Sequence, residues 1–224
     1  MNYSLIIPVY NEQKALPELL KKLNSFNKII EIIFVDDGST DRTNEILKAN
    51  ALRFKLIVNE KNLGKGASIR RGILAANKKN IFFIDGDLEI DTSTIPKLIE
   101  NFESNNYDAM LGIRWERFDF KSIGINRLGN FLINEIFNLI HKTNFSDILC
   151  CVKIIKSDLL KSFKLNSNNF EIESEIMSHI SLKNINYIEQ KVRYTRRNSS
   201  QGKKLKYSDT WSILRFIFGN KNYI

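Results

Sequence analysis

The stretch IFFIDGDLEI, residues 81–90, determines how this sequence is interpreted. Four apolar residues run directly into Asp85, Gly86 and Asp87, so an apparently buried strand ends in two carboxylates separated by one glycine. Carboxylates held this close repel each other unless a cation lies between them. Oxygen ligands suit Mg²⁺ or Mn²⁺, which often connect carboxylates to a diphosphate. Glu89 is a candidate third ligand, and a solvated surface turn is the alternative interpretation.

The composition limits the classes of protein to consider. The chain has 224 residues, 43% of them hydrophobic, and a formal net charge of +9, which predicts one large folded domain. The charge favours a phosphate-bearing substrate, a polyanion or an anionic membrane surface. The only cysteines, Cys150 and Cys151, are adjacent, so we expect neither a disulfide framework nor structural zinc. We expect a cytoplasmic protein without a signal peptide or a membrane-spanning helix.

Short apolar runs alternate with amphipathic segments in the first half of the chain. The runs are apolar at consecutive positions, as expected for strands that are covered on both faces. This alternation predicts a parallel α/β sheet with right-handed crossovers. The expected strands cover residues 3–8, 29–37, 54–59, 81–85 and 109–113, and the expected helices cover residues 15–26, 41–50, 65–77 and 92–104.

The second half has a different pattern. A helix over 122–141, a strand over 150–155, a helix over 173–182, a strand over 186–195 and a helix over 210–218 are expected. The apolar stripe expected on the first of these helices is Ile125, Leu128, Leu132, Ile136 and Leu139. The stripe expected on the last, which packs on the core or lies on a membrane surface, is Trp211, Leu214 and Phe218. We therefore expect one domain over residues 1–206 and a C-terminal amphipathic extension over 207–224.

Polar, turn-forming residues follow four of the expected strands, at 8–12, 36–41, 59–66 and 85–87. Ligands of open α/β sheets bind outside the carboxyl ends of the strands, so these segments predict a binding site. Asp37 is suited to accept hydrogen bonds from a base or a ribose, whereas residues 39–41 are typical of a helix cap. The sequence lacks both the P-loop spacing and a G-x-G-x-x-G after the first strand, which disfavours the nucleotide folds with those fingerprints.

The series LIIPVYNE, IIFVDDGSTDRT, NLGKGASIRRG and FFIDGDLE resembles the family 2 glycosyltransferases, which have the GT-A fold. The second half is similar to the polyprenyl-phosphate branch, typified by dolichyl-phosphate mannose synthase. The matching segments there are LGIR (111–114), NRLGN (126–130), SDILCCVKIIK (146–156), NFEIESEI (169–176) and YTRRNSSQGKK (194–204). The resemblance implies a single Rossmann-like α/β domain with a mostly parallel sheet flanked by helices.

The resemblance also implies roles for individual residues. Residues 8–12 match the stretch that holds the nucleotide, and residues 197–203 match a loop that closes over the diphosphate and the acceptor phosphate. The expected substrate-binding residues are Pro8, Tyr10, Glu12, Asp37, Lys65, Gly86, Arg114 and Arg127. The expected catalytic residues are Asp85, Asp87, Asp147, Arg197 and Lys203. The expected metal ligands are Asp85, Asp87 and Glu89, the last standing where the family usually has glutamine.

The implied reaction is inverting transfer of mannose or glucose from GDP-mannose or UDP-glucose to a dolichyl or undecaprenyl phosphate, with Mg²⁺ or Mn²⁺. A lipid phosphate is already ionised, whereas a sugar hydroxyl needs a general base. Asp147 and Glu175 are candidates for that base, and a structural role is the alternative for both. Such a protein is expected at the cytoplasmic face of a membrane, bound peripherally or to an integral-membrane partner.

Three other functions stay open at this point. The first is a family 2 enzyme that acts on a hydroxyl of a glycan or lipopolysaccharide, although the absence of a Q-x-x-R-W motif argues against polymer synthesis. The second is a nucleic-acid-binding module built on the basic run 191–206, which holds seven Lys or Arg and no acid. Only Tyr194 and Tyr207 lie near that run, so base stacking is poorly supported and no nucleic-acid partner is expected. The third is an inactive relative that only binds a nucleotide sugar, which the intact D-G-D disfavours.

Overall fold

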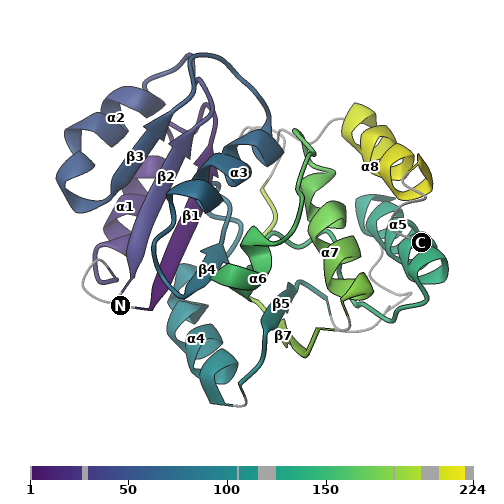
Figure 1. The fold of residues 1–224 in the computed structure, drawn as a ribbon. Coiled ribbons are helices and arrows are strands. Elements are labelled where there is room, and N and C mark those ends of the chain that lie inside the picture. Colours follow the sequence, from purple (N-terminus) through teal and green to yellow (C-terminus); the bar gives the residue numbers. More distant parts are fainter. Residues whose placement is uncertain are drawn as a thin grey trace.

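The computed structural model describes residues 2–26, 30–104, 106–115, 125–183, 185–197 and 207–219. Within these ranges seven strands form one sheet in the order β3-β2-β1-β4-β6-β5-β7 (Figure 1). The strands are β1 (Tyr3–Val9), β2 (Glu31–Asp36), β3 (Lys55–Val58), β4 (Asn80–Phe83), β5 (Ala109–Ile113), β6 (Lys153–Lys156) and β7 (Tyr187–Lys191). The α-helices are α1 (Leu16–Leu23), α2 (Thr43–Ala49), α3 (Lys65–Ala75), α4 (Ile95–Ser104), α5 (Ile125–His141), α6 (Ser157–Lys161), α7 (Ile172–Leu182) and α8 (Tyr207–Gly219). Short 3₁₀ turns cover Ala51–Arg53 and Thr92–Thr94.

The sheet is parallel except at β6. β1 pairs in parallel with β2 and β4, β2 with β3, and β5 with β7. β6 runs antiparallel to both of its neighbours, β4 and β5. A single α/β domain with a mostly parallel sheet is therefore confirmed, and the carboxyl ends of β1, β2, β3 and β4 lie at the same edge.

Helices cover both faces of the sheet, which explains why the strands are apolar at consecutive positions. In β1, Leu5 and Ile7 point into the core beneath α1, α2 and α4, whereas Ile6 points into the core beneath α3 and α5 to α8. In β2, Phe34 and Ile33 divide between the two cores in the same way. A strand with one face in water alternates apolar and polar residues, whereas a strand buried on both faces is apolar at nearly every position.

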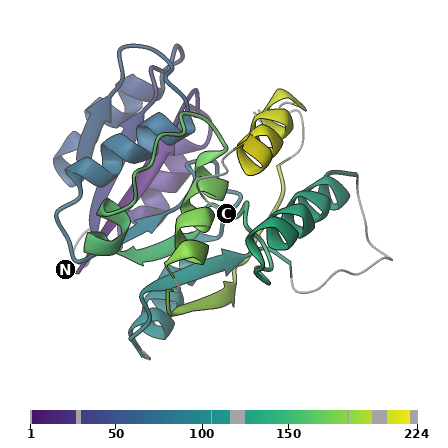
Figure 2. The same ribbon diagram turned by 45° about the vertical axis from the view of Figure 1, so that its right-hand side comes forward.

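The helices α5 and α8 lie side by side at the margin of the domain (Figures 1 and 2). Ile133 and Phe137 of α5 are buried, whereas Leu128, Leu132 and Leu139 are exposed. Three leucines of the apolar stripe predicted from the sequence therefore lie outside the core, whereas Ile136 of the same stripe packs against it. The helix has a second apolar stripe, and that one faces the core.

On α8 as well, the most deeply buried side chains are not those of the stripe predicted from the sequence. Ile213 and Ile217 enter the core shared with α5 and α7, while Trp211 is 71% exposed and Phe218 is 61% exposed. The extension docks on the domain, as one of the two expectations had it, but through isoleucines rather than through Trp211 and Phe218. No helix in the part of the chain that the structure describes has the length and apolarity needed to cross a membrane.

Candidate active site

The four polar segments converge at the carboxyl edge of the parallel strands. The backbone N–H of Asp37 donates to the carbonyl of Val9 at 2.8 Å, and that of Asn59 donates to the carbonyl of Asp36 at 2.8 Å, so the first three strand ends are fastened together. The N–H of Glu12 donates to Thr43 Oγ1 at 2.7 Å. Pro8 and Tyr10, at and just after the end of β1, are half-buried beside this edge.

The carboxylate of Asp37 stabilises the loop that precedes α3. It is 4% exposed, and its carboxylate accepts hydrogen bonds from Asn59 Nδ2 at 2.7 Å and from the amides of Leu63 and Gly64, both at 2.9 Å. Gly64 has a φ of +97°, and a Cβ there would lie 2.3 Å from the carbonyl oxygen of Asn168. The loop before α3 is thereby fixed in a conformation that requires glycine. A contact between Asp37 and a nucleotide stays a prediction.

Asp85 and Asp87, called the acidic pair below, lie at the centre of this edge, just after the end of β4. Gly86 packs so closely that a Cβ would lie 2.4 Å from a methyl group of Val9. Burial and the charge of Asp85 raise the pKa of Asp87 to about 7, even though Asp87 accepts a 3.0 Å hydrogen bond from the backbone N–H of Glu89. Two oxygen donors that repel each other in this way fit a hard divalent cation, which would relieve the repulsion.

The segment after β7 lies across this pair. The backbone N–H of Arg197 donates to Glu89 Oε1 at 2.9 Å, and Arg197 Nη1 pairs with Glu12 Oε2 at 2.9 Å. Among the described residues no three His, Cys, Asp or Glu side chains form a group that could hold a metal. The structure thus does not bring Glu89 into a three-carboxylate cluster with the acidic pair, and its role as a ligand stays a prediction. Lys203 lies outside the described residues.

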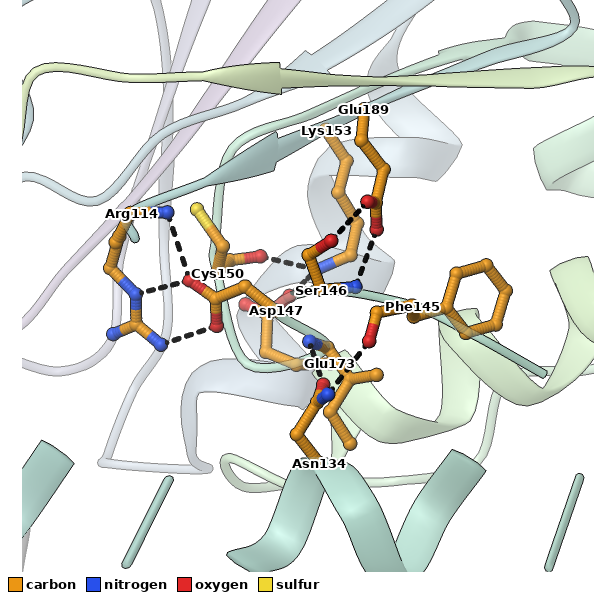
Figure 3. Close-up of polar contacts among 10 residues, drawn as sticks. Arg114, Asn134, Phe145, Ser146, Asp147, Cys150, Lys153, Glu173 and Glu189 are labelled. Atoms are coloured by element: carbon orange, nitrogen blue, oxygen red, sulfur yellow. Dashed lines mark hydrogen bonds and ion pairs between the residues drawn. The ribbon is translucent and has the colours of Figure 1, made fainter. Parts of the chain in front are cut away.

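A line of four alternating charges runs from the acidic pair into the core. Lys65 Nζ lies 2.7 Å from Asp85 Oδ1 and 3.0 Å from Glu173 Oε1. Glu173 Oε2 lies 2.5 Å from Lys153 Nζ, which also donates to the carbonyl of Cys150 (Figure 3). Burial alone would lower the pKa of Lys65, but the two carboxylates raise it well above its ordinary value. Lys65 is therefore an ammonium ion beside the acidic pair.

Arg114 and Asp147 form a buried fork. Arg114 Nε and Nη2 lie 2.8 and 2.7 Å from the two carboxylate oxygens of Asp147, and the backbone N–H of Arg114 adds a 3.0 Å bond (Figure 3). The Arg114 side chain is 12% exposed and that of Asp147 is 4% exposed. Asn134 on α5 holds the loop that carries Asp147, since it accepts from the N–H of Ile148 and donates to the carbonyl of Phe145.

Aromatic rings surround this fork. The guanidinium carbon of Arg114 lies 4.3 Å from the ring centroid of Trp115 and 5.6 Å from that of Tyr194. The guanidinium carbon of Arg127 lies 5.8 Å from the Trp115 centroid on α5's side of the cluster. The structure therefore gathers both arginines expected to bind phosphate around one indole ring.

Glu175, the other candidate base, also binds backbone amides of a neighbouring loop. It is 1% exposed, and its carboxylate accepts from the amides of Asn166 at 2.8 Å and Ser167 at 2.9 Å. A Cβ on Gly66 would lie 2.4 Å from the carbonyl oxygen of Ser167, so this loop packs directly against the first turn of α3. Both candidate bases thus hold parts of the chain in place.

Comparison with known proteins identifies the family. The family model described as "Glycosyl transferase family 2" matches residues 4–163. An uncharacterised protein of Methanocaldococcus jannaschii is 35% identical over 202 residues, which cover 84% of this chain and 85% of that protein. The chain belongs to glycosyltransferase family 2.

Two relatives of this family 2 glycosyltransferase have names that state a reaction. The dodecaprenyl-phosphate galacturonate synthase of Rhizobium johnstonii is 27% identical over 74% of this chain and 51% of that enzyme. The undecaprenyl-phosphate 4-deoxy-4-formamido-L-arabinose transferase of Edwardsiella ictaluri is 33% identical over 71% of this chain and 50% of that enzyme. The chain thus spans about half the length of these two named relatives.

Solved structures support the fold of the transferase. Glucosyl-3-phosphoglycerate synthase from Mycobacterium tuberculosis, crystallised with Mn²⁺, UDP and glucosyl-3-phosphoglycerate, superposes with a TM-score of 0.76. The superposition covers 99% of this chain and 80% of that one at 15% identity. The expected GT-A architecture is confirmed.

The sequence did not reveal two members of the transferase's site, Lys153 and Glu173. Lys153 stands within the apolar run CCVKII, where a charge in an otherwise buried strand was a usable signal. Glu173 shares its helix with other acids, and nothing in the sequence shows which of them points at Lys65.

Proposed function

We propose that this glycosyltransferase transfers a sugar from a nucleotide diphosphate sugar to a polyprenyl phosphate. One observation carries the choice of acceptor: neither candidate base is available. Asp147 is held in the fork with Arg114, and Glu175 accepts two backbone amides. A hydroxyl acceptor needs a base within hydrogen-bond reach, whereas a phosphate monoester is already an anion at neutral pH. The names of the two relatives, both polyprenyl-phosphate enzymes, support the same acceptor.

The donor's diphosphate is the leaving group, and it must be stabilised as negative charge develops on it. Asp85 and Asp87 would hold Mg²⁺ or Mn²⁺, and such an ion supplies positive charge next to that diphosphate. Arg197 adds a cation at the same edge, because its guanidinium already lies at the end of β1 beside Glu12. Lys203 is proposed to add another. Direct attack on the anomeric carbon inverts its configuration.

The acceptor phosphate is proposed to bind near Arg114 and Arg127. Trp115 lies against both guanidinium groups and keeps them together at the start of α5. The fork with Asp147 fixes the Arg114 side chain, so its position is set before any substrate binds. An anion in this place neither loses nor gains a proton during the transfer.

A lipid acceptor needs access from a membrane surface. The helices α5 and α8 lie against each other (Figure 2). Both carry exposed apolar side chains. They are Leu128, Leu132, Leu139, Trp211 and Phe218. Together with the net charge of +9, these helices favour peripheral binding to an anionic membrane, proposed to be its cytoplasmic face.

The identity of the sugar is a separate part of the proposal. Mannose from GDP-mannose and glucose from UDP-glucose remain the proposed donors, although the named relatives carry galacturonate and formamido-arabinose. Thermal stabilisation by GDP, UDP and dTDP, each with Mn²⁺, identifies the base, because a ligand of the native state raises the melting temperature.

The acceptor is tested by offering matched lipids with a radiolabelled donor. Undecaprenyl phosphate should be glycosylated, whereas undecaprenol, which has the same chain but ends in a hydroxyl, should not. Free oligosaccharides serve as a third acceptor. Transfer to undecaprenol or to an oligosaccharide at a rate equal to or above that for the phosphate would refute the proposal and favour a hydroxyl acceptor.

A further inference from the structure

Lys65 is the first residue of α3, and its ammonium group already occupies one oxygen of the acidic pair. Nζ lies 2.7 Å from Asp85 Oδ1, while its own side chain is only 13% exposed. A divalent cation bound by Asp85 and Asp87 has to share that carboxylate with a second positive charge. The two cations repel each other, and partial burial weakens the screening by water.

The ammonium group has little freedom to leave. Its second contact, Glu173, is 3.0 Å away and is itself held by Lys153 at 2.5 Å. The backbone on its N-terminal side is fixed as well, because Asp37 accepts the amides of Leu63 and Gly64. The positive charge is thus built into the metal site.

We propose that Lys65 makes cation binding at the acidic pair depend on a nucleotide diphosphate. In the free protein the ammonium group competes for Asp85 and repels the incoming ion. A diphosphate brings several negative charges to the same place, which offset the repulsion. The ion and the nucleotide therefore bind as a pair. This inference rests on the proposed function for the class of donor, but not for the acceptor.

Binding equilibria are reciprocal, so the same coupling has two consequences. Mn²⁺ alone should bind weakly and should bind at least about tenfold more tightly when the nucleotide is present, a difference of about 1.4 kcal/mol. The nucleotide should gain the same factor from Mn²⁺. Removing the ammonium group should strengthen the binding of Mn²⁺ alone and shrink the coupling.

The test measures Mn²⁺ binding to the full chain, not turnover. Free Mn²⁺ is counted by electron paramagnetic resonance in titrations without nucleotide, with GDP and with UDP. Lys65→Met should bind Mn²⁺ alone about tenfold or more tightly than the wild type, and Lys65→Arg, which keeps the charge, should resemble the wild type. Lys61→Met is the matched control, since Lys61 is an exposed lysine of the loop before α3 and its loss changes the net charge equally.

Three results would overturn the inference. The first is wild-type protein that binds Mn²⁺ equally well with and without a nucleotide that it demonstrably binds. The second is folded Lys65→Met whose affinity for Mn²⁺ alone is unchanged or weaker. The third is an equal gain in Lys61→Met. Should Lys65→Met not fold, Lys65→Gln takes its place: it also removes the positive charge, keeps a polar group that can donate to Asp85, and leaves the pair of Glu173 and Lys153 intact; the same gain is expected from it.

These results are independent of the acceptor assay. A protein that glycosylates an oligosaccharide but shows the coupling refutes only the proposed acceptor. A protein that glycosylates undecaprenyl phosphate without the coupling refutes only the role of Lys65. Failure to bind any nucleotide refutes the proposed donor, and the comparison of Lys65→Met with wild type in Mn²⁺ alone still tests the repulsion.

Discussion

Asp147→Asn separates a structural role for this residue from a catalytic one. The change keeps the shape of the side chain but removes the charge that faces Arg114 across distances of 2.7 and 2.8 Å. The guanidinium would stay buried without its counterion. Breaking a buried pair from one side costs about 3–5 kcal/mol, against a total stability of about 5–15 kcal/mol. In a chain of this size the melting temperature should fall by about 6–20 °C.

The assay combines urea unfolding with turnover on undecaprenyl phosphate at low temperature, expressed per folded molecule. We expect a large loss of stability and a kcat within about tenfold of wild type, since a general base would contribute about 10²–10⁴. Asp108→Asn is the matched control. Asp108 forms an ion pair of 2.8 Å with Lys156, but both side chains are 38% exposed, so the expected cost is below about 1 kcal/mol. Unchanged stability with a kcat reduced about a hundredfold or more would refute the reasoning.

Three further predictions follow from the site and the exposed helices. Asp85→Asn and Asp87→Asn should each abolish Mn²⁺-dependent nucleotide binding in calorimetry, because each removes an anionic ligand of the ion; retained binding would contradict the metal site. The pKa of Asp87 is about 7 without a metal, so a proton competes with the ion for this carboxylate below pH 7. The affinity for Mn²⁺ in the presence of nucleotide should therefore rise about tenfold from pH 6 to pH 8 and then level off. An affinity independent of pH would argue against Asp87 as a ligand. The double variant Leu132→Glu, Trp211→Glu should lose most of its binding to anionic vesicles in a flotation assay. The double variant Leu52→Glu, Leu74→Glu, which makes the same change of charge at two exposed leucines remote in sequence from both helices, should not; equal losses would indicate that charge alone drives binding.

The sequence predicted the elements that carry a strong local signal. Strand β5 was placed at its observed bounds, and the acidic pair was located because two carboxylates follow an apolar run. Strand ends are informative because the parallel arrangement brings them to one edge whatever the details of packing. The convergence of four polar segments was therefore predictable from order alone.

The hydrogen-bond partners of individual side chains could not be predicted from the sequence. The carboxylates of Asp37 and Glu175 each accept two backbone amides from another loop, and this arrangement depends on the tertiary path of the chain. The helices α5 and α8 each have two apolar stripes, and the periodicity of the sequence does not show which stripe packs against the core. The short helix α6 was not predicted, because its five residues are too few for a periodic pattern.

Strand β6 has a consequence for how this enzyme can be dissected. It is the one reversed strand, and it is paired on both sides, with β4 and with β5. A fragment that stops before it would leave β4 as a bare, apolar border prone to join other chains. The part of the chain that precedes β6 is therefore not expected to fold as an autonomous module, and chimaeras with relatives should exchange the whole domain rather than halves of it.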